Sequence, residues 1–198
     1  MDKLIPSTKT CFQLMDAYHM LANIKAHSVM VARVAHLIAR GLRDAGFDIS
    51  VELTTAASLL HDIGKTASLN SGVDHAELGR EICRKNGFSR IGDIVGEHVR
   101  LNGFTVNGNY SEKEIVFYAD KRVNHDAVVS LEERLKYLIE TYAQNQETRV
   151  NAIRTNFEIC RQVEKKLFSK LDFPPASLSQ RVGSERIGSD IEETSEAT

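Results

Sequence analysis

Hydrophobic residues recur at steps of three and four along almost the whole chain, the spacing that places them on one face of a helix. The clearest stripe is formed by Met30, Val31, Val34, Ile38 and Leu42. No alternating apolar and polar run is long enough to indicate a useful strand. The pattern therefore predicts an all-α fold, a single-domain helical bundle. Helices are expected over residues 9–21, 25–45, 51–61, 90–101, 112–125, 131–142 and 146–171.

Polar residues that can cap a helix mark three further boundaries. A cap residue followed three positions later by glutamate can satisfy free backbone N–H groups in the first turn. This spacing occurs in Asp74 with Glu77, Ser111 with Glu114, and Ser130 with Glu133. The segment 102–110 holds two glycines and three asparagines, so we expect a loop there, one that could border a functional site. The charged run 132–134 is interpreted as a solvated helix face.

The composition is that of a compact enzyme. A chain of 198 residues fits one domain, and 42% hydrophobic with 26% charged residues are ordinary globular values. A formal net charge of −2 argues against an electrostatic clamp on long nucleic acid. Because no apolar run approaches the roughly 20 residues that span a bilayer, we expect a cytoplasmic protein with no membrane partner. The three cysteines lack paired spacing and are expected to be reduced, buried thiols.

The composition changes after Phe173, where serine, glutamate, glycine and threonine replace large apolar residues. We therefore predict a folded domain over residues 1–173 and a flexible polar C-terminal tail over 174–198. A neighbouring copy or a partner could hold this tail, which leaves a homo-oligomer through the tail open.

Four histidines and two aspartates carry the candidate chemistry. They are, in order, His27, His61, Asp62, His75, His98 and Asp120. Imidazole nitrogens and carboxylates are the ligands from which hydrolytic metal sites are made. A single histidine on an inward helix face is more often a hydrogen-bonded core residue than a ligand. The adjacent pair His61 and Asp62, followed by glycine and lysine, changes that balance.

The segment 59–65 reads Leu-Leu-His-Asp-Ile-Gly-Lys. It resembles the core motif of the HD phosphohydrolase superfamily, all-helical metal enzymes that cleave phosphate esters. The resemblance covers about residues 20–140. It implies that His27, His61, Asp62 and Asp120 bind a first metal ion. It also implies that His75 and His98 bind a second ion, as in relatives with two metals.

Such a ligand set favours one or two divalent transition metal ions, Fe, Mn, Co, Ni or Zn, over the oxygen-only sites of magnesium or calcium. If two ions are present, Asp62 is the natural bridge, because it lies between the two ligand sets. A bridging water would then become a hydroxide nucleophile near neutral pH.

Basic residues near these ligands are candidates for binding the substrate phosphate. Lys65 is the strongest, although an arbitrary lysine is usually solvated. Lys121 and Arg122 follow Asp120 directly, and we expect one of them to reach the rim of the site and the other to be solvated. Arg100, two residues after His98, is a weaker candidate.

The sequence predicts a metal-dependent hydrolase that cleaves a phosphate ester or anhydride of a small phosphorylated metabolite, a nucleotide or dinucleotide. The ligand order resembles that of small bacterial HD enzymes that cleave dinucleoside polyphosphates, and also that of cyclic-dinucleotide phosphodiesterases, whose long signature loop is not evident. The alternative is a non-catalytic HD module that binds metal and nucleotide as a sensor or interaction domain. Retention of every expected ligand together with Lys65 favours the enzyme.

Overall fold

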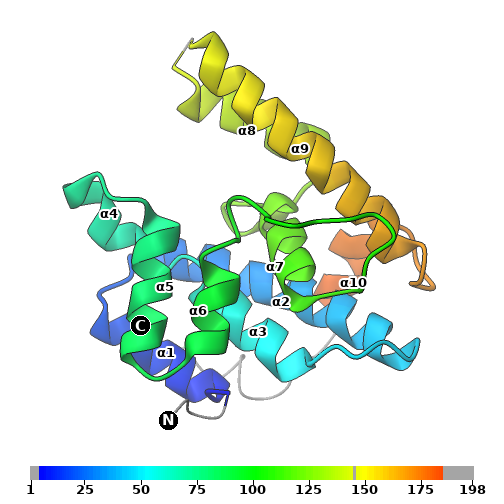
Figure 1. Ribbon diagram of the computed structural model, residues 1–198, viewed down its shortest axis with the longest axis horizontal. Coiled ribbons are helices and arrows are strands. Elements are labelled where there is room, and N and C mark those ends of the chain that lie inside the picture. The colour runs from blue at the N-terminus through cyan, green and yellow to red at the C-terminus, as the bar shows by residue number, and fades with distance from the viewer. Residues whose placement is uncertain (1–4, 145, 185–198) are drawn as a thin grey trace.

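The computed structural model describes residues 5–144 and 146–184, and helices dominate it (Figure 1). The prediction of an all-α fold is confirmed, apart from one short hairpin. The helices are α1 (Thr8–Ala17), α2 (Ala22–Asp44), α3 (Val51–Leu60), α4 (Lys65–Ser71), α5 (His75–Lys85), α6 (Ser89–Val95), α7 (Glu112–Lys121), α8 (Leu131–Tyr142), α9 (Glu147–Phe168) and α10 (Leu178–Ser184). A 3-10 helix, η1 (Pro175–Ser177), precedes α10.

The three predicted helix caps are present. Asp74 accepts hydrogen bonds from the backbone N–H groups of Ala76 and Glu77 at the start of α5. Ser111 does the same for Glu114 in α7. At α8, Ser130 and Glu133 form a complete capping box. Local polar chemistry therefore fixes the first residue of each of these helices.

Three predicted helices end at least four residues earlier than expected, the first being α1, which ends at Ala17 and not at residue 21. α7 ends at Lys121, and the chain turns into a hairpin of β1 (Val123–Asn124) and β2 (Ala127–Val128), antiparallel in register. At its tip, His125 has a φ of 54°, a left-handed conformation that no α-helix continues. α6 ends at Val95, after which the backbone tightens into three-residue hydrogen bonds, so His98 lies beyond the helix.

Gly64 follows the His-Asp doublet and separates α3 from α4, a helix that the sequence pattern did not predict. Its φ of −80° is open to any residue, so turning is not what requires glycine. A Cβ atom at this position would lie 2.4 Å from the carbonyl oxygen of His75 and 2.6 Å from the backbone nitrogen of Gly79. The missing side chain therefore lets α5 pack directly against the doublet.

Two apolar clusters form the core. One includes Ile38 of α2, Phe117 of α7 and Phe157 of α9. The other includes Met15 of α1 and Leu60 of α3 and extends to α5 and α6. α2 and α3 pack against each other and contribute to both clusters, and all described side chains of α3 except Glu52 are buried. The metal-site candidates lie where these helices meet.

The C-terminal segment corrects the prediction of a flexible tail that starts at residue 174. Residues 174–184 continue into η1 and α10, and Leu178 and Val182 are buried in the first core cluster. Because they are four residues apart, they lie on one face of the helix. Residues 185–198, the rest of the predicted tail, lie outside the described residues.

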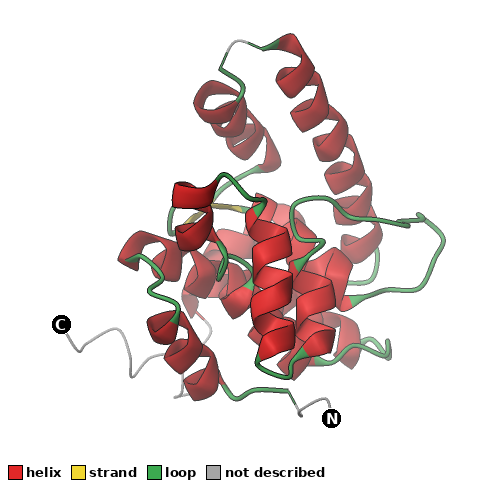
Figure 2. Cartoon of the chain, turned by 60° about the vertical axis from the view of Figure 1, so that its left-hand side comes forward, coloured by secondary structure: helices red, strands yellow, loops and turns green. Residues whose placement is uncertain are grey.

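α8 and α9 pack side by side and project from the rest of the molecule (Figures 1 and 2). Their predicted extents, 131–142 and 146–171, are close to those observed. None of the helices in the described residues combines the length and the apolar character that crossing a bilayer requires. The three cysteines are free and buried, as the sequence predicted.

The burial of α10 predicts that its apolar face stabilises the domain. Leu178→Ala should lower the free energy of unfolding by about 2–5 kcal/mol, because it removes a fully buried side chain. Gln180→Ala, an exposed position on the same helix, should change it by less than about 0.5 kcal/mol. Urea unfolding followed by circular dichroism measures both. Equal stability of the two variants would show that α10 does not contribute to the core.

Candidate metal centre

Five segments of the chain bring the six predicted ligands together. His27 lies in the second turn of α2, and His61 and Asp62 follow the end of α3. His75 is the first residue of α5, His98 follows α6, and Asp120 is the last residue but one of α7. Most of the set therefore sits at helix ends, where the chain can aim side chains from several directions at one point.

The first half of the cluster joins His27, His61 and Asp120, whose ligand atoms all lie within 4.8 Å of one another. The Nε2 atom of His27 is 3.2 Å from Oδ1 of Asp120. The Nε2 atom of His61 is 3.8 Å from the same oxygen and 3.5 Å from Oδ2 of Asp62. A similar grouping joins His61, Asp62 and His98, so the two groups share His61.

The second half places two imidazoles against the other oxygen of Asp62. The Nε2 atoms of His75 and His98 are 3.2 Å apart. They lie 3.4 Å and 3.6 Å, respectively, from Oδ1 of Asp62. Oδ1 thus faces His75 and His98, while Oδ2 faces His61. This division of the two oxygens is the arrangement expected of a bridging carboxylate.

Backbone carbonyls fix the orientation of three rings. The Nδ1 atoms of His27, His61 and His98 lie 2.8, 2.7 and 2.6 Å from the carbonyl oxygens of His125, Ser58 and Val95. A carbonyl only accepts, so each Nδ1 carries the proton and donates it. The lone pair of each ring is therefore on Nε2, the atom that points into the cluster.

A divalent metal ion fits this set of donors. In the described residues, Nε2 of His61 and Oδ1 of Asp62 are buried without a hydrogen-bond partner. A buried polar atom left without a partner costs about 1–3 kcal/mol, so two of them side by side indicate that a ligand satisfies them. Imidazole and carboxylate together suit divalent transition metals. The cluster could therefore hold a metal ion.

The protonation states also suit metal binding. Complete burial lowers the pKa of His61 to about 3, and burial with the neighbouring His98 lowers the pKa of His75. Burial alone would raise the pKa of Asp62, but His61, His98 and Lys65 hold it well below its usual range. The same opposition, with Lys121 and His27 as the main partners, lowers the pKa of Asp120. Neutral imidazoles and ionised carboxylates are the forms that coordinate metals.

Lys65 lies at the edge of the cluster. Its Nζ atom donates to Oδ2 of Asp62 at 2.7 Å, and its side chain is 33% exposed. Burial opposes its charge, but Asp62, then Asp120 and Tyr142, raise its pKa. Lys65 therefore carries an ammonium that contacts a predicted ligand and is still open to solvent.

The other basic candidates occupy different places. Lys121 is buried and donates to the carbonyl oxygen of His98 and to Oδ2 of Asp120, so it positions two ligands. Arg122 is also buried, and its contacts are with Val129, Tyr118, Glu164 and Pro175. The expectation that one of the two is solvated is wrong, because both side chains are held by partners far along the chain. Arg100 is exposed and stays a candidate.

Arg134 is a site residue that the sequence interpretation missed. It belongs to the charged run 132–134, but its side chain is buried. Its Nη1 atom donates to Oδ1 of Asn124 at 3.0 Å, and Nη2 lies 3.8 Å from Oδ1 of Asp120. A signal existed: Leu131, Arg134 and Leu135 follow the helical step of three and four that marks an inward face.

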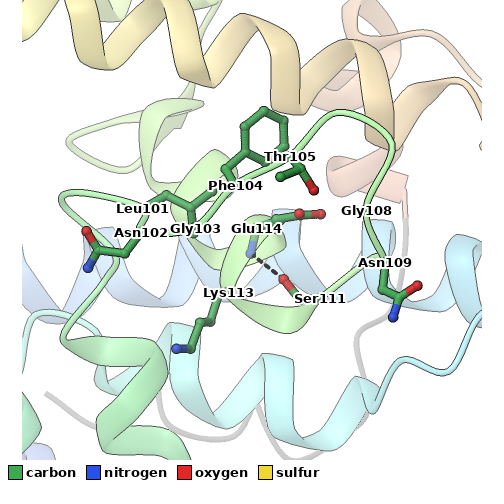
Figure 3. A pocket seen from close by; sticks show the side chains of 10 residues that line it. All are labelled: Leu101, Asn102, Gly103, Phe104, Thr105, Gly108, Asn109, Ser111, Lys113 and Glu114. Atoms are coloured by element: carbon green, nitrogen blue, oxygen red, sulfur yellow. Dashed lines mark hydrogen bonds between the residues drawn. The ribbon is translucent and has the colours of Figure 1, made fainter.

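The predicted loop 102–110 is present and lines a cavity of about 170 Å³ (Figure 3). Lys166 of α9 holds this loop by donating to the carbonyl oxygens of Thr105 and Asn109 and to Oε1 of Glu114. None of the six candidate ligands lines the cavity. The side chains that do are Leu101, Asn102, Phe104, Thr105, Asn109, Ser111, Lys113 and Glu114, with Gly103 and Gly108.

The cluster, its helical scaffold and the motif at residues 59–65 agree with a comparison against known families. The HD domain family matches residues 24–124, a little more than half of the chain. The chain belongs to the HD domain family. Members of this family are typically metal-dependent phosphohydrolases, and the matched region contains all six candidate ligands.

Among individual proteins, an uncharacterized protein of Methanocaldococcus jannaschii is 26% identical over 150 residues, 69% of this chain and 88% of that protein. A ribonuclease Y of Aquifex aeolicus is 30% identical over 176 residues, 77% of this chain and 30% of that protein. A ribonuclease Y of Treponema denticola is 38% identical over 77 residues, 38% of this chain and 14% of that protein. The chain thus spans less than a third of either ribonuclease. No solved structure matches it significantly.

The divided contacts of Asp62 predict two metal ions in this HD domain. Reconstitution in excess divalent metal should give close to two ions per chain, measured by elemental analysis after gel filtration. The double variant His75→Ala, His98→Ala should bind close to one, because Oδ1 of Asp62 loses both imidazole neighbours. Circular dichroism checks that the variant is folded. One ion in the wild type, unchanged in the variant, would make these two histidines structural.

Proposed function

We propose that this HD domain is a metal-dependent hydrolase that cleaves a phosphate ester or anhydride of a small phosphorylated metabolite, a nucleotide or dinucleotide. The observation that carries the proposal is the buried pair of unsatisfied atoms, Nε2 of His61 and Oδ1 of Asp62, beside the partly exposed ammonium of Lys65. Metal donors and a phosphate-binding cation then share one site.

A divalent metal ion bound here would lower the pKa of a coordinated water towards neutrality and neutralise charge on a phosphoryl group. We propose a transition metal, Fe, Mn, Co, Ni or Zn, because most of the donors are imidazole nitrogens. Asp62 is the residue that links the two halves of the ligand set. His27 and Asp120 complete one half, and His75 and His98 the other.

Lys65 is placed to bind the substrate. Its ammonium has three donors, one of which bonds to Asp62. The side chain is partly exposed, so its remaining donors can reach a phosphoryl oxygen held next to the Asp62 carboxylate. A fixed positive charge at that point stabilises the negative charge that develops as the phosphate bond breaks.

Two alternatives to this proposed function are a different substrate and a non-catalytic role. Similarity to a ribonuclease Y over 77% of this chain favours a phosphodiester bond between nucleotides as a second candidate substrate. The net charge of −2 weighs against a long nucleic acid. A non-catalytic sensor module is the other alternative, and the presence of all six ligands with Lys65 speaks against it.

Asp62 is the residue whose loss should abolish the activity. Hydrolysis of bis(p-nitrophenyl) phosphate and of a nucleotide panel, tested with several divalent metals, should disappear in Asp62→Ala together with most of the bound metal. The helical circular dichroism should stay close to that of the wild type. Asp44→Ala, an exposed aspartate at the far end of α2, is the matched control and should retain both metal and activity. Full activity in Asp62→Ala would end this proposal.

Lys65→Ala separates phosphate binding from metal binding. Because an ammonium has no lone pair for coordination, the variant should keep its metal content. Its kcat/KM should fall by roughly one to three powers of ten, the scale of losing one positioned electrostatic contact. Lys85→Ala, at the exposed end of α5, is the control. Loss of metal would assign Lys65 a folding role, and unchanged kinetics would make it a surface lysine.

A further inference from the structure

Three aromatic side chains form a row that begins in the hairpin after α7 and ends at the last residue of α8. The ring centroids of His125 and Tyr137 are 5.3 Å apart, and those of Tyr137 and Tyr142 are 6.5 Å apart. His125 is exposed, Tyr142 is 51% exposed, and Tyr137 is partly buried. Because these aromatic side chains are partly exposed to solvent, an aromatic ring of a ligand can stack on them.

The row is joined to the metal centre where it begins. The carbonyl oxygen of His125 accepts the hydrogen bond from Nδ1 of His27, at 2.8 Å. The guanidinium of Arg134 lies 5.5 Å from the ring centroid of Tyr137, and its Nη2 atom is 3.8 Å from Oδ1 of Asp120. His125 therefore contacts a predicted metal ligand directly, and Tyr137 is linked to another predicted ligand through Arg134.

The far end of the row is Tyr142, the last residue of α8. After Asp62 and Asp120, Tyr142 is a further group that raises the pKa of Lys65, whose ammonium contacts Asp62. The row thus contacts Arg134 at Tyr137 and influences Lys65 from Tyr142, and both of these cations lie beside candidate ligands. α8 projects with α9 from the bundle, so this face is carried by a part of the molecule that reaches past the helices of the core (Figure 1).

Arg134 has bonding capacity beyond its role inside the domain. Among the described residues, Nε of this buried side chain has no hydrogen-bond partner, and the contact with Asp120 at 3.8 Å is longer than a hydrogen bond. A guanidinium beside the metal ligands suits a planar, charge-assisted contact with phosphate oxygens.

We propose that His125, Tyr137 and Tyr142 form a stacking surface for the nucleobase of the substrate, and that Arg134 contacts its phosphate next to the metal centre. The inference rests on the proposed function and narrows its substrate to a nucleotide. Aromatic side chains bind any base through its face, so the surface selects for a base and tolerates its identity. The base can belong to a free nucleotide or to the end of an RNA strand.

Binding of three hydrolysis-resistant probes to the metal-loaded protein tests the proposal by calorimetry. They are α,β-methylene-ADP, methylenediphosphonate, which has the same phosphonate group without a base, and a phosphorothioate-linked trinucleotide. Tyr137→Ala and Tyr142→Ala should weaken binding of α,β-methylene-ADP roughly ten- to hundredfold and leave methylenediphosphonate unchanged. Tyr137→Phe, which keeps the ring, should bind like the wild type.

Binding of the trinucleotide distinguishes a base of a free nucleotide from a base at the end of an RNA strand. Tighter binding of the trinucleotide than of α,β-methylene-ADP, lost in Tyr142→Ala, would identify an RNA end, and equal binding would identify a free nucleotide. Val106→Ala, an exposed position on the loop 102–110, is the surface control. The stacking surface is overturned if neither tyrosine variant changes nucleotide binding. It is also overturned if the variants reduce the affinities for α,β-methylene-ADP and methylenediphosphonate equally.

Arg134→Met tests the phosphate contact separately. This variant should bind both α,β-methylene-ADP and methylenediphosphonate more weakly, while its metal content stays at the wild-type level. Loss of metal would overturn this part, since Arg134 would then only position Asp120. These binding measurements do not require catalysis. If the protein shows no hydrolysis but its nucleotide binding depends on the tyrosine rings, only the proposed hydrolase function is refuted. An active hydrolase whose nucleotide binding ignores the rings would refute the stacking surface alone.

Discussion

A carboxylate with almost no contact with water, that of Asp62, faces the imidazoles of His61, His75 and His98 and the ammonium of Lys65. A buried charge is tolerated only when polar partners surround it, so this residue dictates where its neighbours must lie. The segments that carry these neighbours are correspondingly fixed. Gly64 admits α5 to contact distance, which sets His75, and Lys121 holds the carbonyl of His98.

Hydrogen bonds at the ends of two helices both satisfy backbone carbonyls and orient histidine rings. Carbonyls in the last turn of a helix have no partner inside it. The carbonyls of Ser58 in α3 and Val95 in α6 accept from the rings of His61 and His98, and Val95 also accepts from the backbone N–H of His98. The same bonds set the tautomer and direct each Nε2 atom into the cluster. Helix termination and ligand orientation are therefore one structural feature, which explains why these histidines follow helices and do not lie within them.

Much of this site could be predicted from the sequence because its information is local. The doublet at His61 and Asp62, the caps at Asp74 and Ser111, and the order of the ligands all depend on short spacings. The ends of α6 and α7 could not be predicted, since three-residue turns and the hairpin at His125 determine them. α10 was missed because a short helix with only two buried apolar residues gives a weak pattern.

Buried cations were the hardest to place, since their partners are distant in sequence. Lys121, Arg122 and Lys166 are each bonded to backbone carbonyls and to at least one carboxylate, which uses their donors for structure. Lys121 and Arg122, the basic residues that directly follow Asp120, are thus buried and bonded inside the domain. Besides Lys121, Lys65 and Arg134 place positive charge beside the candidate ligands. Because Arg134 belongs to α8, the orientation of that projecting helix determines where this guanidinium lies relative to Asp120.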